Sequence, residues 1–347
     1  MVQATPSPSR VAEATAACRL DLAGGVLSAL STGALPAGAL SVALAVDRRA
    51  FARVEAGTRG VEIESKDTLL KIAAPNVSSL SKDGLAGLVR RVLLGLELET
   101  GLRVVTQARV PFGAGLASAG ALAIAVAAAA ARAAGRELSA EALAAFARHA
   151  DEGPGGERME PAGALASVLG GVTCAPLASG PGTRLRADPA RAEECLLLVD
   201  PASGPGIRQP TGGENAAGDR RTDGVVAGAP AGRLAQIAAL AGRAREALEE
   251  GRMAEVAEVL RAERRAREGL VPGEAGEGIR PIVGIVEAAG GGARLCGSGT
   301  ASLVLVWAEP GARSAGPREV AVRELKAAGY RLFPCRVDLR GFEVEDA

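Results

Sequence analysis

The sequence predicts a two-domain protein in which strands and helices are mixed. Two observations support this prediction. The chain has 347 residues, more than one hydrophobic core usually supports, and 48% of them are hydrophobic, which is enough for two cores. Short apolar runs typical of strands also alternate along the chain with runs that have helical spacing.

In the first half of the chain, strands are expected at residues 11–22, 39–55, 102–110 and 168–177. Helices are expected at residues 84–98, 121–135 and 139–149. The first of these helices has leucines and valines three and four residues apart, which is the period of an apolar helix face. The last begins at Ser139, a typical N-cap residue, with Glu141 in its first turn.

The proline- and glycine-containing stretch at residues 178–191 is the expected domain boundary, giving a first domain at 1–185 and a second at 190–347. Strands then follow at 195–199, 303–307, 330–337 and 341–344. Helices follow at 281–289 and 320–328, and residues 234–267 are expected to form two helices that meet at Gly251. Residues 203–228 are polar and glycine-rich, which fits both a substrate-covering loop and an insertion with no role.

Composition narrows the range of partners. The chain has 40 basic and 40 acidic residues, so it has no net charge that would attract nucleic acid or an anionic membrane. Its five dispersed cysteines indicate free thiols in a reducing compartment. Neither a secretory signal nor a membrane span is evident. We expect a cytoplasmic protein with a small-molecule substrate and leave a homodimer open.

The most informative segment is the glycine-rich turn at residues 111–121, which leads from a strand into an alanine-rich helix. Gly113 and Gly115 allow positive φ values and a close approach of the backbone to a ligand. The N–H groups that follow, together with the positive end of the helix, are typical of an anion site. The phosphates of a nucleotide suit such a turn.

Two further segments accompany this turn. The first is Ala16-Ala17-Cys18-Arg19-Leu20-Asp21-Leu22-Ala23-Gly24-Gly25, and the other is Leu295-Cys296-Gly297-Ser298-Gly299-Thr300-Ala301-Ser302. In chain order, the segment ending at Gly25 is the first motif, the glycine turn is the second, and the segment ending at Ser302 is the third. Together they resemble the three motifs of the GHMP kinase superfamily, the group of galactokinase, homoserine kinase, mevalonate kinase and phosphomevalonate kinase. The first segment is most similar to the sugar and sugar-phosphate branch, which includes heptose-7-phosphate kinases and fucokinases. The resemblance spans nearly the whole chain.

The resemblance implies an α+β fold, with a left-handed β-α-β element in the N-terminal domain, an α+β C-terminal domain, and ATP and Mg²⁺ as cofactors in the cleft between the domains. It implies that Ser118 and Glu157 bind the metal, and that Arg19 balances charge on the transferred phosphoryl group. The residues it assigns to ATP are Pro111, Gly113, Ala114, Gly115, Leu116, Ala117, Ser118, Gly297, Ser298, Gly299 and Thr300.

The chain departs from the family where a catalytic Asp is expected. Residues 162–166 are Ala, Gly, Ala, Leu and Ala, none of which accepts a proton. Val26 and Leu27 follow the first motif where sugar kinases have a Thr-Asp pair that binds hydroxyl groups. Asp21 is a candidate substitute base, and the alternative is a structural role in which it caps the nearby loop. Glu263 and the arginines that follow it are expected on a solvated helix face.

These observations favour an ATP-dependent kinase that phosphorylates a hydroxyl group of a sugar, a sugar phosphate or a similar metabolite. The first alternative is a catalytically silent relative that binds a nucleotide or metabolite. A second alternative is a relative of the mevalonate-pathway kinases and decarboxylases, which the sequence Gly156-Glu157-Arg158-Met159 suggests.

Overall fold

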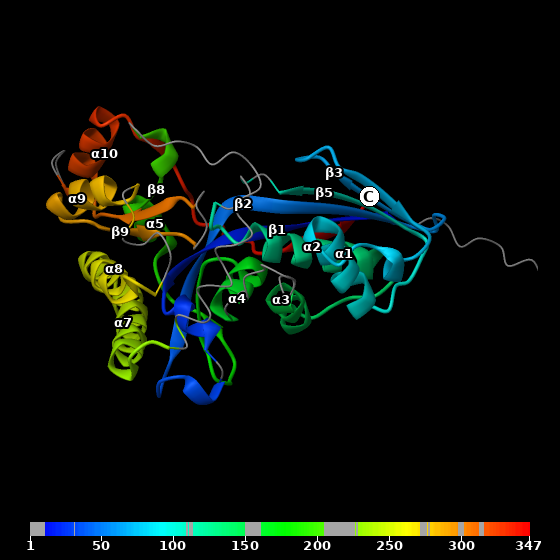
Figure 1. The fold of residues 1–347 in the computed structure, drawn as a ribbon, viewed down its shortest axis with the longest axis horizontal. Coiled ribbons are helices and arrows are strands. Elements are labelled where there is room, and N and C mark those ends of the chain that lie inside the picture. Colours follow the sequence, from blue (N-terminus) through cyan, green and yellow to red (C-terminus); the bar gives the residue numbers. More distant parts are fainter. Residues whose placement is uncertain are drawn as a thin grey trace, which may run out of the picture.

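Two β-sheets organise the part of the chain described by a computed structural model (Figure 1). The described residues are 11–30, 32–108, 110, 114–149, 161–204, 226, 228–270, 276, 278–297, 302–311 and 316–347. The larger sheet comprises β1 (Val11–Ala23), β2 (Leu40–Ala56), β3 (Val61–Ser65), β4 (Lys71–Ala74), β5 (Leu102–Ala108), β6 (Val172–Pro176), β7 (Thr183–Arg184) and β12 (Glu343–Asp346). The smaller comprises β8 (Leu196–Asp200), β9 (Gly292–Leu295), β10 (Val304–Trp307) and β11 (Arg331–Phe333).

The long strands β1 and β2 are paired neighbours within the larger sheet. In the larger sheet the order is β12-β1-β2-β5-β3-β4, and β6 pairs with the other end of β2 and carries β7. The β3–β5 pair is parallel, whereas β1–β2 and β2–β5 are antiparallel. In the smaller sheet the order is β11-β8-β10-β9, and the pairs β11–β8, β8–β10 and β10–β9 are antiparallel.

Helices accompany both sheets. Those beside the larger sheet are α1 (Gly84–Gly95), α2 (Ser118–Ala133), α3 (Ala140–His149) and α4 (Pro161–Leu169) (Figure 1). Those at the other end of the molecule are α5 (Pro189–Cys195), α7 (Ala231–Glu249), α8 (Met253–Arg267), α9 (Arg280–Ala288) and α10 (Pro317–Ala327). Short 3₁₀ turns lie at η1 (Gly25–Ala29), η2 (Thr32–Ala34), η3 (Val77–Ser79) and η4 (Pro201–Ser203).

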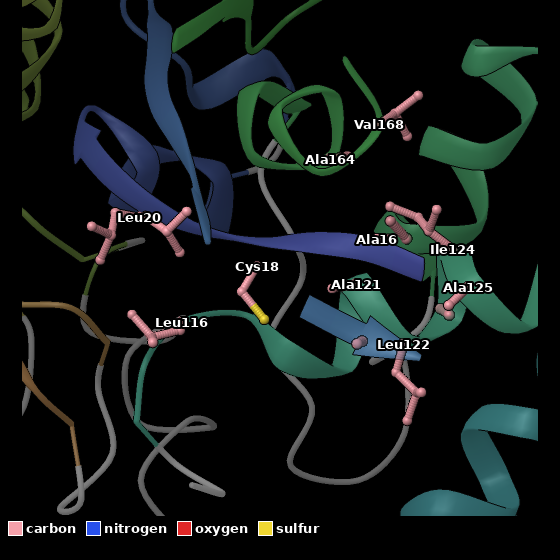
Figure 2. Packing of buried hydrophobic residues seen from close by; sticks show 14 of the residues in the cluster. Ala16, Cys18, Leu20, Leu116, Ala121, Leu122, Ile124, Ala125, Ala164 and Val168 are labelled. Atoms are coloured by element: carbon pink, nitrogen blue, oxygen red, sulfur yellow. The ribbon is translucent and has the colours of Figure 1, made fainter. Parts of the chain in front are cut away.

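The core of the larger domain depends on the small side chains of α2. From Gly120 to Ala131 every residue of this helix is buried, and the helix contacts both β1 and β2. Figure 2 shows Ala121 and Ala125 of this helix in one core with Cys18 of β1 and Ala164 of α4. Alanine lets the helix backbone approach the sheet closely, so the beginning of α2 is held firmly against the strand that carries the first motif.

Most of the predicted elements are confirmed. The strands near 11–22, 39–55 and 102–110 are β1, β2 and β5, and residues 234–267 form α7 and α8, which meet at Gly251 as expected. The N–H of Ala142 donates to Ser139 Oγ at 3.3 Å, as expected of an N-cap. The strand expected at 168–177 is wrong at its start, because residues 168 and 169 end α4 and β6 begins at Val172.

The two-domain arrangement agrees with the prediction, but the C-terminal segment crosses between the sheets. β12, expected within the second domain at 190–347, pairs with β1 of the larger sheet, with Ala14 opposite Val344. The chain end therefore belongs to the first sheet in space. The boundary at 185–190 stays a prediction. Among the described helices, none combines the length and the apolar character that a membrane span requires.

The five cysteines are buried free thiols. Burial raises the pKa of Cys18 and of Cys195 to about 12 from the ordinary 9.0. Only thiolates react rapidly with disulfide reagents. We predict that, at pH 8, Ellman's reagent titrates the native protein far more slowly than the protein in guanidinium chloride, where five thiols react.

The same pKa shifts predict alkaline destabilisation. The folded state holds these thiols neutral, so their contribution to stability is complete below about pH 9, the ordinary thiol pKa, and is lost as the pH rises towards about 12. Thermal melts from pH 8 to pH 11 should show a falling midpoint, and Cys18→Ser should reduce that fall. Rapid labelling of all five thiols in the native state at pH 8 would contradict the burial.

Candidate functional site

In its described part, residues 114–117, the turn before α2 combines buried apolar side chains with a glycine and an alanine. Ala114 and Leu116 are buried, so their side chains anchor the turn in the core. Between them, Gly115 has a φ of +76°. Ala117 also lies in the left-handed region, at φ 51° and ψ 41°, and precedes α2 as its N-cap without a side-chain hydrogen bond. The N-cap residue therefore gives no side-chain hydrogen bond to the start of α2.

The start of α2 is suited to an anion. The helix begins at Ser118 and has no acidic residue in its first turn. The first N–H groups of a helix have no intrahelical acceptor, and the helix dipole places partial positive charge there. An anion satisfies both. The half-buried Ser118 adds a hydroxyl group at the same position.

The first motif holds the turn through the backbone. The N–H of Arg19, on β1, donates to the carbonyl oxygen of Leu116 at 3.1 Å. From the other domain, the N–H of Leu303 donates to the carbonyl oxygen of Ala114 at 3.1 Å. The turn is thus fixed from both sides by groups that do not depend on side-chain identity.

The third motif meets the turn at two glycines. A Cβ atom added to Gly115 would lie 2.6 Å from the backbone nitrogen of Gly297, and one added to Gly297 would lie 2.9 Å from the Cα of Gly115. Neither position accepts a larger residue without movement. The three segments that the sequence singles out therefore converge at one place.

Asp21 lies close by on β1, two residues from Arg19 and thus on the same face of the strand. Its Oδ1 accepts the N–H of Gly25 at 3.2 Å. Its Oδ2 lies 2.9 Å from Arg294 Nη2 and 3.5 Å from Arg267 Nη1, and Arg294 also donates to the carbonyl oxygen of Asp21. Both carboxylate oxygens are therefore occupied, as the structural interpretation of Asp21 requires.

The Gly24-Gly25 turn at the end of β1, which belongs to the first motif, is held by a carboxylate from α8. Gly24 has a φ of +79°, and its N–H donates to Glu263 Oε1 at 3.1 Å. Glu263 is fully buried, and Arg267 Nη1 lies 3.8 Å from the same oxygen. The expectation that Glu263 lies on a solvated helix face is therefore wrong.

Arg294, like Glu263, has no exposed surface. Burial lowers its pKa, but the charges of Asp21 and Glu263 and the hydrogen bond with Asp21 raise the pKa by more, so the net direction is upward. The guanidinium group is therefore charged at any physiological pH.

Sequence reasoning missed Glu263, Arg267 and Arg294. A signal for the first two was present, because the apolar face of α8 at Met253, Val256 and Leu260 continues at helical spacing through Glu263 and Arg267. No comparable pattern marks Arg294, which is placed by strand pairing of β9 with β10.

The structure brings together Arg19, Asp21, residues 114–118 and Gly297. Pro111, Gly113, Glu157, Ser298, Gly299 and Thr300 lie outside the described residues. Residues 162–166, where the resemblance places a catalytic Asp, are part of α4, and Ala162 and Ala166 pack in a small cluster against Ala17 and Ala43. Among the described residues, no group of three or more His, Cys, Asp or Glu side chains could hold a metal ion.

Part of the chain matches the model of a known protein family. Residues 84–171, which include α1, β5, the glycine turn, α2 and α4, match the family model of the GHMP kinases N terminal domain. No protein with a curated functional description matches the sequence.

Solved structures match over nearly the whole chain. A D-glycero-D-manno-heptose 1-phosphate kinase from Bacteroides thetaiotaomicron has a TM-score of 0.71 and 18% identity, covering 97% of this chain and 99% of its own. The galactokinase of Lactococcus lactis, in complex with galactose, has a TM-score of 0.71 and 13% identity, covering 99% and 96%. The mevalonate kinase of Methanococcus jannaschii has a TM-score of 0.64 and 14% identity, covering 96% and 99%. At these identities the likeness establishes the fold.

The contact between Gly115 and Gly297 leads to a prediction about stability. Gly115→Ala places a Cβ atom 2.6 Å from the nitrogen of Gly297 and a non-glycine residue at φ +76°, so we expect a loss of about 2 kcal/mol. The matched control is Gly242→Ala inside α7, where nothing lies within 4 Å of the added atom. This control should gain about 0.5–1 kcal/mol through helix propensity.

Thermal or urea unfolding of the two variants measures the difference. Equal stability of Gly115→Ala and the wild type would show that the two domains do not meet as described.

Proposed function

We propose that this chain, which contains a GHMP kinase N-terminal domain and has the GHMP kinase fold, is an ATP-dependent kinase that transfers the γ-phosphate to a hydroxyl group of a small metabolite. The observation that carries the proposal is the convergence of the first motif, the glycine turn and the third motif around the start of α2. A nucleoside triphosphate supplies the anion that this arrangement fits.

The turn binds phosphate in this proposal through its backbone. Gly115 carries no side chain, and Ala117 carries only a methyl group, so a phosphate can reach the N–H groups of residues 115–118. The absence of an acidic residue from the first turn of α2 removes a source of repulsion. Gly297 would close the site from the second domain.

Mg²⁺ would be held by the Ser118 hydroxyl group, the phosphates and Glu157. The hydroxyl group fits, because Ser118 opens α2 beside the turn. Oxygen ligands and substrate phosphates are the usual environment of this ion. When bound, Mg²⁺ neutralises charge on the phosphates. Glu157 is proposed from the resemblance alone.

Arg19 is the cation of the first motif in this proposal. Its backbone N–H is bonded to the glycine turn, so its side chain begins next to the phosphate site. The residue is 6% exposed, and a guanidinium group in such surroundings stabilises charge on a transferring phosphoryl group more strongly than it would in water.

The acceptor is proposed to be a sugar or a sugar phosphate. This choice is supported by the likeness to the heptose 1-phosphate kinase and to the galactokinase that was solved with galactose. The first motif adds to this support, because its Arg19 and Gly24-Gly25 are the residues of this chain that resemble the sugar branch.

The alternative function is a silent relative that binds nucleotide without turnover. The occupied oxygens of Asp21 favour it, because a carboxylate held by Arg294 and the Gly25 N–H is a poor base. Phosphoryl transfer tolerates the loss of a base, however, since its transition state is loose and catalysis is largely positioning and charge neutralisation. The kinase therefore remains the leading proposal.

Ligand-induced stabilisation tests the nucleotide site. At about 100 times its Kd, MgATP should stabilise the protein by about 2.7 kcal/mol. Ser118→Ala should remove the Mg²⁺-dependent part of the shift. The control Ser78→Ala, in the exposed turn η3, should leave that part of the shift intact. The absence of any shift with all nucleoside triphosphates would overturn the phosphate-site proposal.

Turnover separates the two functions. Release of ADP should depend on a sugar or sugar phosphate when a panel of such compounds is supplied. Stabilisation by MgATP without turnover on sugars, sugar phosphates and mevalonate would favour the silent relative.

A further inference from the structure

Four buried charges join the two domains at the first motif. This interdomain charge cluster consists of Asp21 on β1, Glu263 and Arg267 on α8, and Arg294 on β9. The exposed fraction of each side chain is at most 8%. Asp21 belongs to the larger sheet, whereas β9 belongs to the smaller sheet and α8 packs against β9.

We infer that Glu263 and Arg294 are positioning residues, which hold the first motif in register with the glycine turn and the third motif. The inference rests on the proposed function, because it assigns these residues to the alignment of the phosphoryl-transfer site. Neither residue belongs to the three motifs.

Glu263 acts on the turn that ends β1. Its Oε1 accepts the N–H of Gly24 at 3.1 Å, and Gly24 has no room for a side chain, because a Cβ atom would lie 2.2 Å from the carbonyl oxygen of Leu40. The Gly24-Gly25 turn is therefore confined on one side by the backbone of β2, and on the other side it is hydrogen-bonded to α8. Movement of the turn would be transmitted along β1 to Arg19.

Arg294 acts on the same strand from the smaller sheet. It donates to the carbonyl oxygen of Asp21 and lies 2.9 Å from Asp21 Oδ2, so it contacts both the backbone and the side chain of one residue. Just after Arg294 in the chain, Cys296 and Gly297 lie against Gly115. One short segment thus binds the first motif at Arg294 and the glycine turn at Gly297.

The cluster is buried, so each charge depends on the others. An ion taken out of water needs partners in the protein, and removal of one partner leaves an uncompensated charge. A purely apolar contact would hold the domains together equally well, but it would not fix the direction of the Gly24 N–H. The hydrogen bonds to backbone groups of the motif are therefore the observation that points to positioning.

The first experiment compares Glu263→Ala, Glu263→Gln and a neighbouring control. The alanine variant removes the acceptor of the Gly24 N–H, whereas glutamine retains an amide oxygen. The control is Arg264→Gln, whose side chain is 11% exposed and is paired with Glu268 and Glu287 rather than with the first motif. All variants are measured at a temperature where each is fully folded.

Hydrogen exchange reports positioning without reference to activity. We expect exchange in a peptide covering residues 22–28 to accelerate at least about tenfold in Glu263→Ala, to accelerate less in Glu263→Gln, and to be unchanged in Arg264→Gln. Unchanged exchange in Glu263→Ala would overturn the inference, whether or not the protein is a kinase. If the alanine variant does not fold, the glutamine variant and its control provide the same comparison.

Steady-state kinetics supply the second readout. Misalignment of reacting groups lowers kcat, so we expect a loss of at least about tenfold in Glu263→Ala, partial rescue in Glu263→Gln, and a KM for ATP within about threefold of the wild type. A lower thermal midpoint with unchanged kcat would show a merely structural role and would overturn the inference. Failure of the wild type to bind or use ATP would instead overturn the proposed function, and the exchange result would stand on its own.

Arg294 has a matched control in the other domain. Arg294→Lys keeps the charge but replaces the planar guanidinium group, whose Nη2 contacts both the carbonyl oxygen and Oδ2 of Asp21, with an ammonium group of different shape. Arg49→Lys makes the same change in another largely buried ion pair, with Asp338 at 2.6 Å. We expect both variants to lose stability and only Arg294→Lys to lose kcat. Equal loss of kcat in both, or in neither, would contradict the assignment of Arg294.

Discussion

The backbone of Gly115 lies so close to that of Cys296 and Gly297 that neither glycine has space for a Cβ atom. This approach constrains the rest of the structure, because it joins the start of α2 in one domain to the end of β9 in the other. The hydrogen bonds from Arg19 to Leu116 and from Leu303 to Ala114 continue the same contact on either side. The segments of the candidate site are thus held together mainly by main-chain groups.

The parts of the fold that the sequence predicted are those with strong periodic patterns. The long strands β1 and β2 and the helices α1, α2, α7 and α8 carry such patterns, and glycines or prolines separate them. The sequence did not predict β3 and β4, which are short, and residues 168–169 were assigned to a strand although they end α4. An apolar run such as Val168-Leu169 fits either element, and only the packing of α4 against β1 and β2 decides between them.

The part of the candidate site that depends on glycines and backbone groups could be predicted from the sequence. The glycines were predicted to bring the backbone close to a ligand, and the structure shows the backbones of Gly115 and Gly297 close to each other. The charged residues were harder to predict because their environment is set by tertiary contacts. Glu263 and Arg267 resemble surface residues of a charged helix, yet they are buried where α8 meets β1. Asp21 was open to two interpretations, and its contact with Arg294, 273 residues away, could not be derived from local sequence.

A crystal structure with a non-hydrolysable ATP analogue and Mg²⁺ tests the central claim most directly, namely that the three convergent segments form one nucleotide phosphate site. We predict that the β- and γ-phosphates accept hydrogen bonds from backbone N–H groups of residues 115–118 at the start of α2, with Gly297 beside them and the Ser118 hydroxyl group at the metal. Phosphates bound elsewhere on the chain, with the start of α2 free of them, would contradict the account.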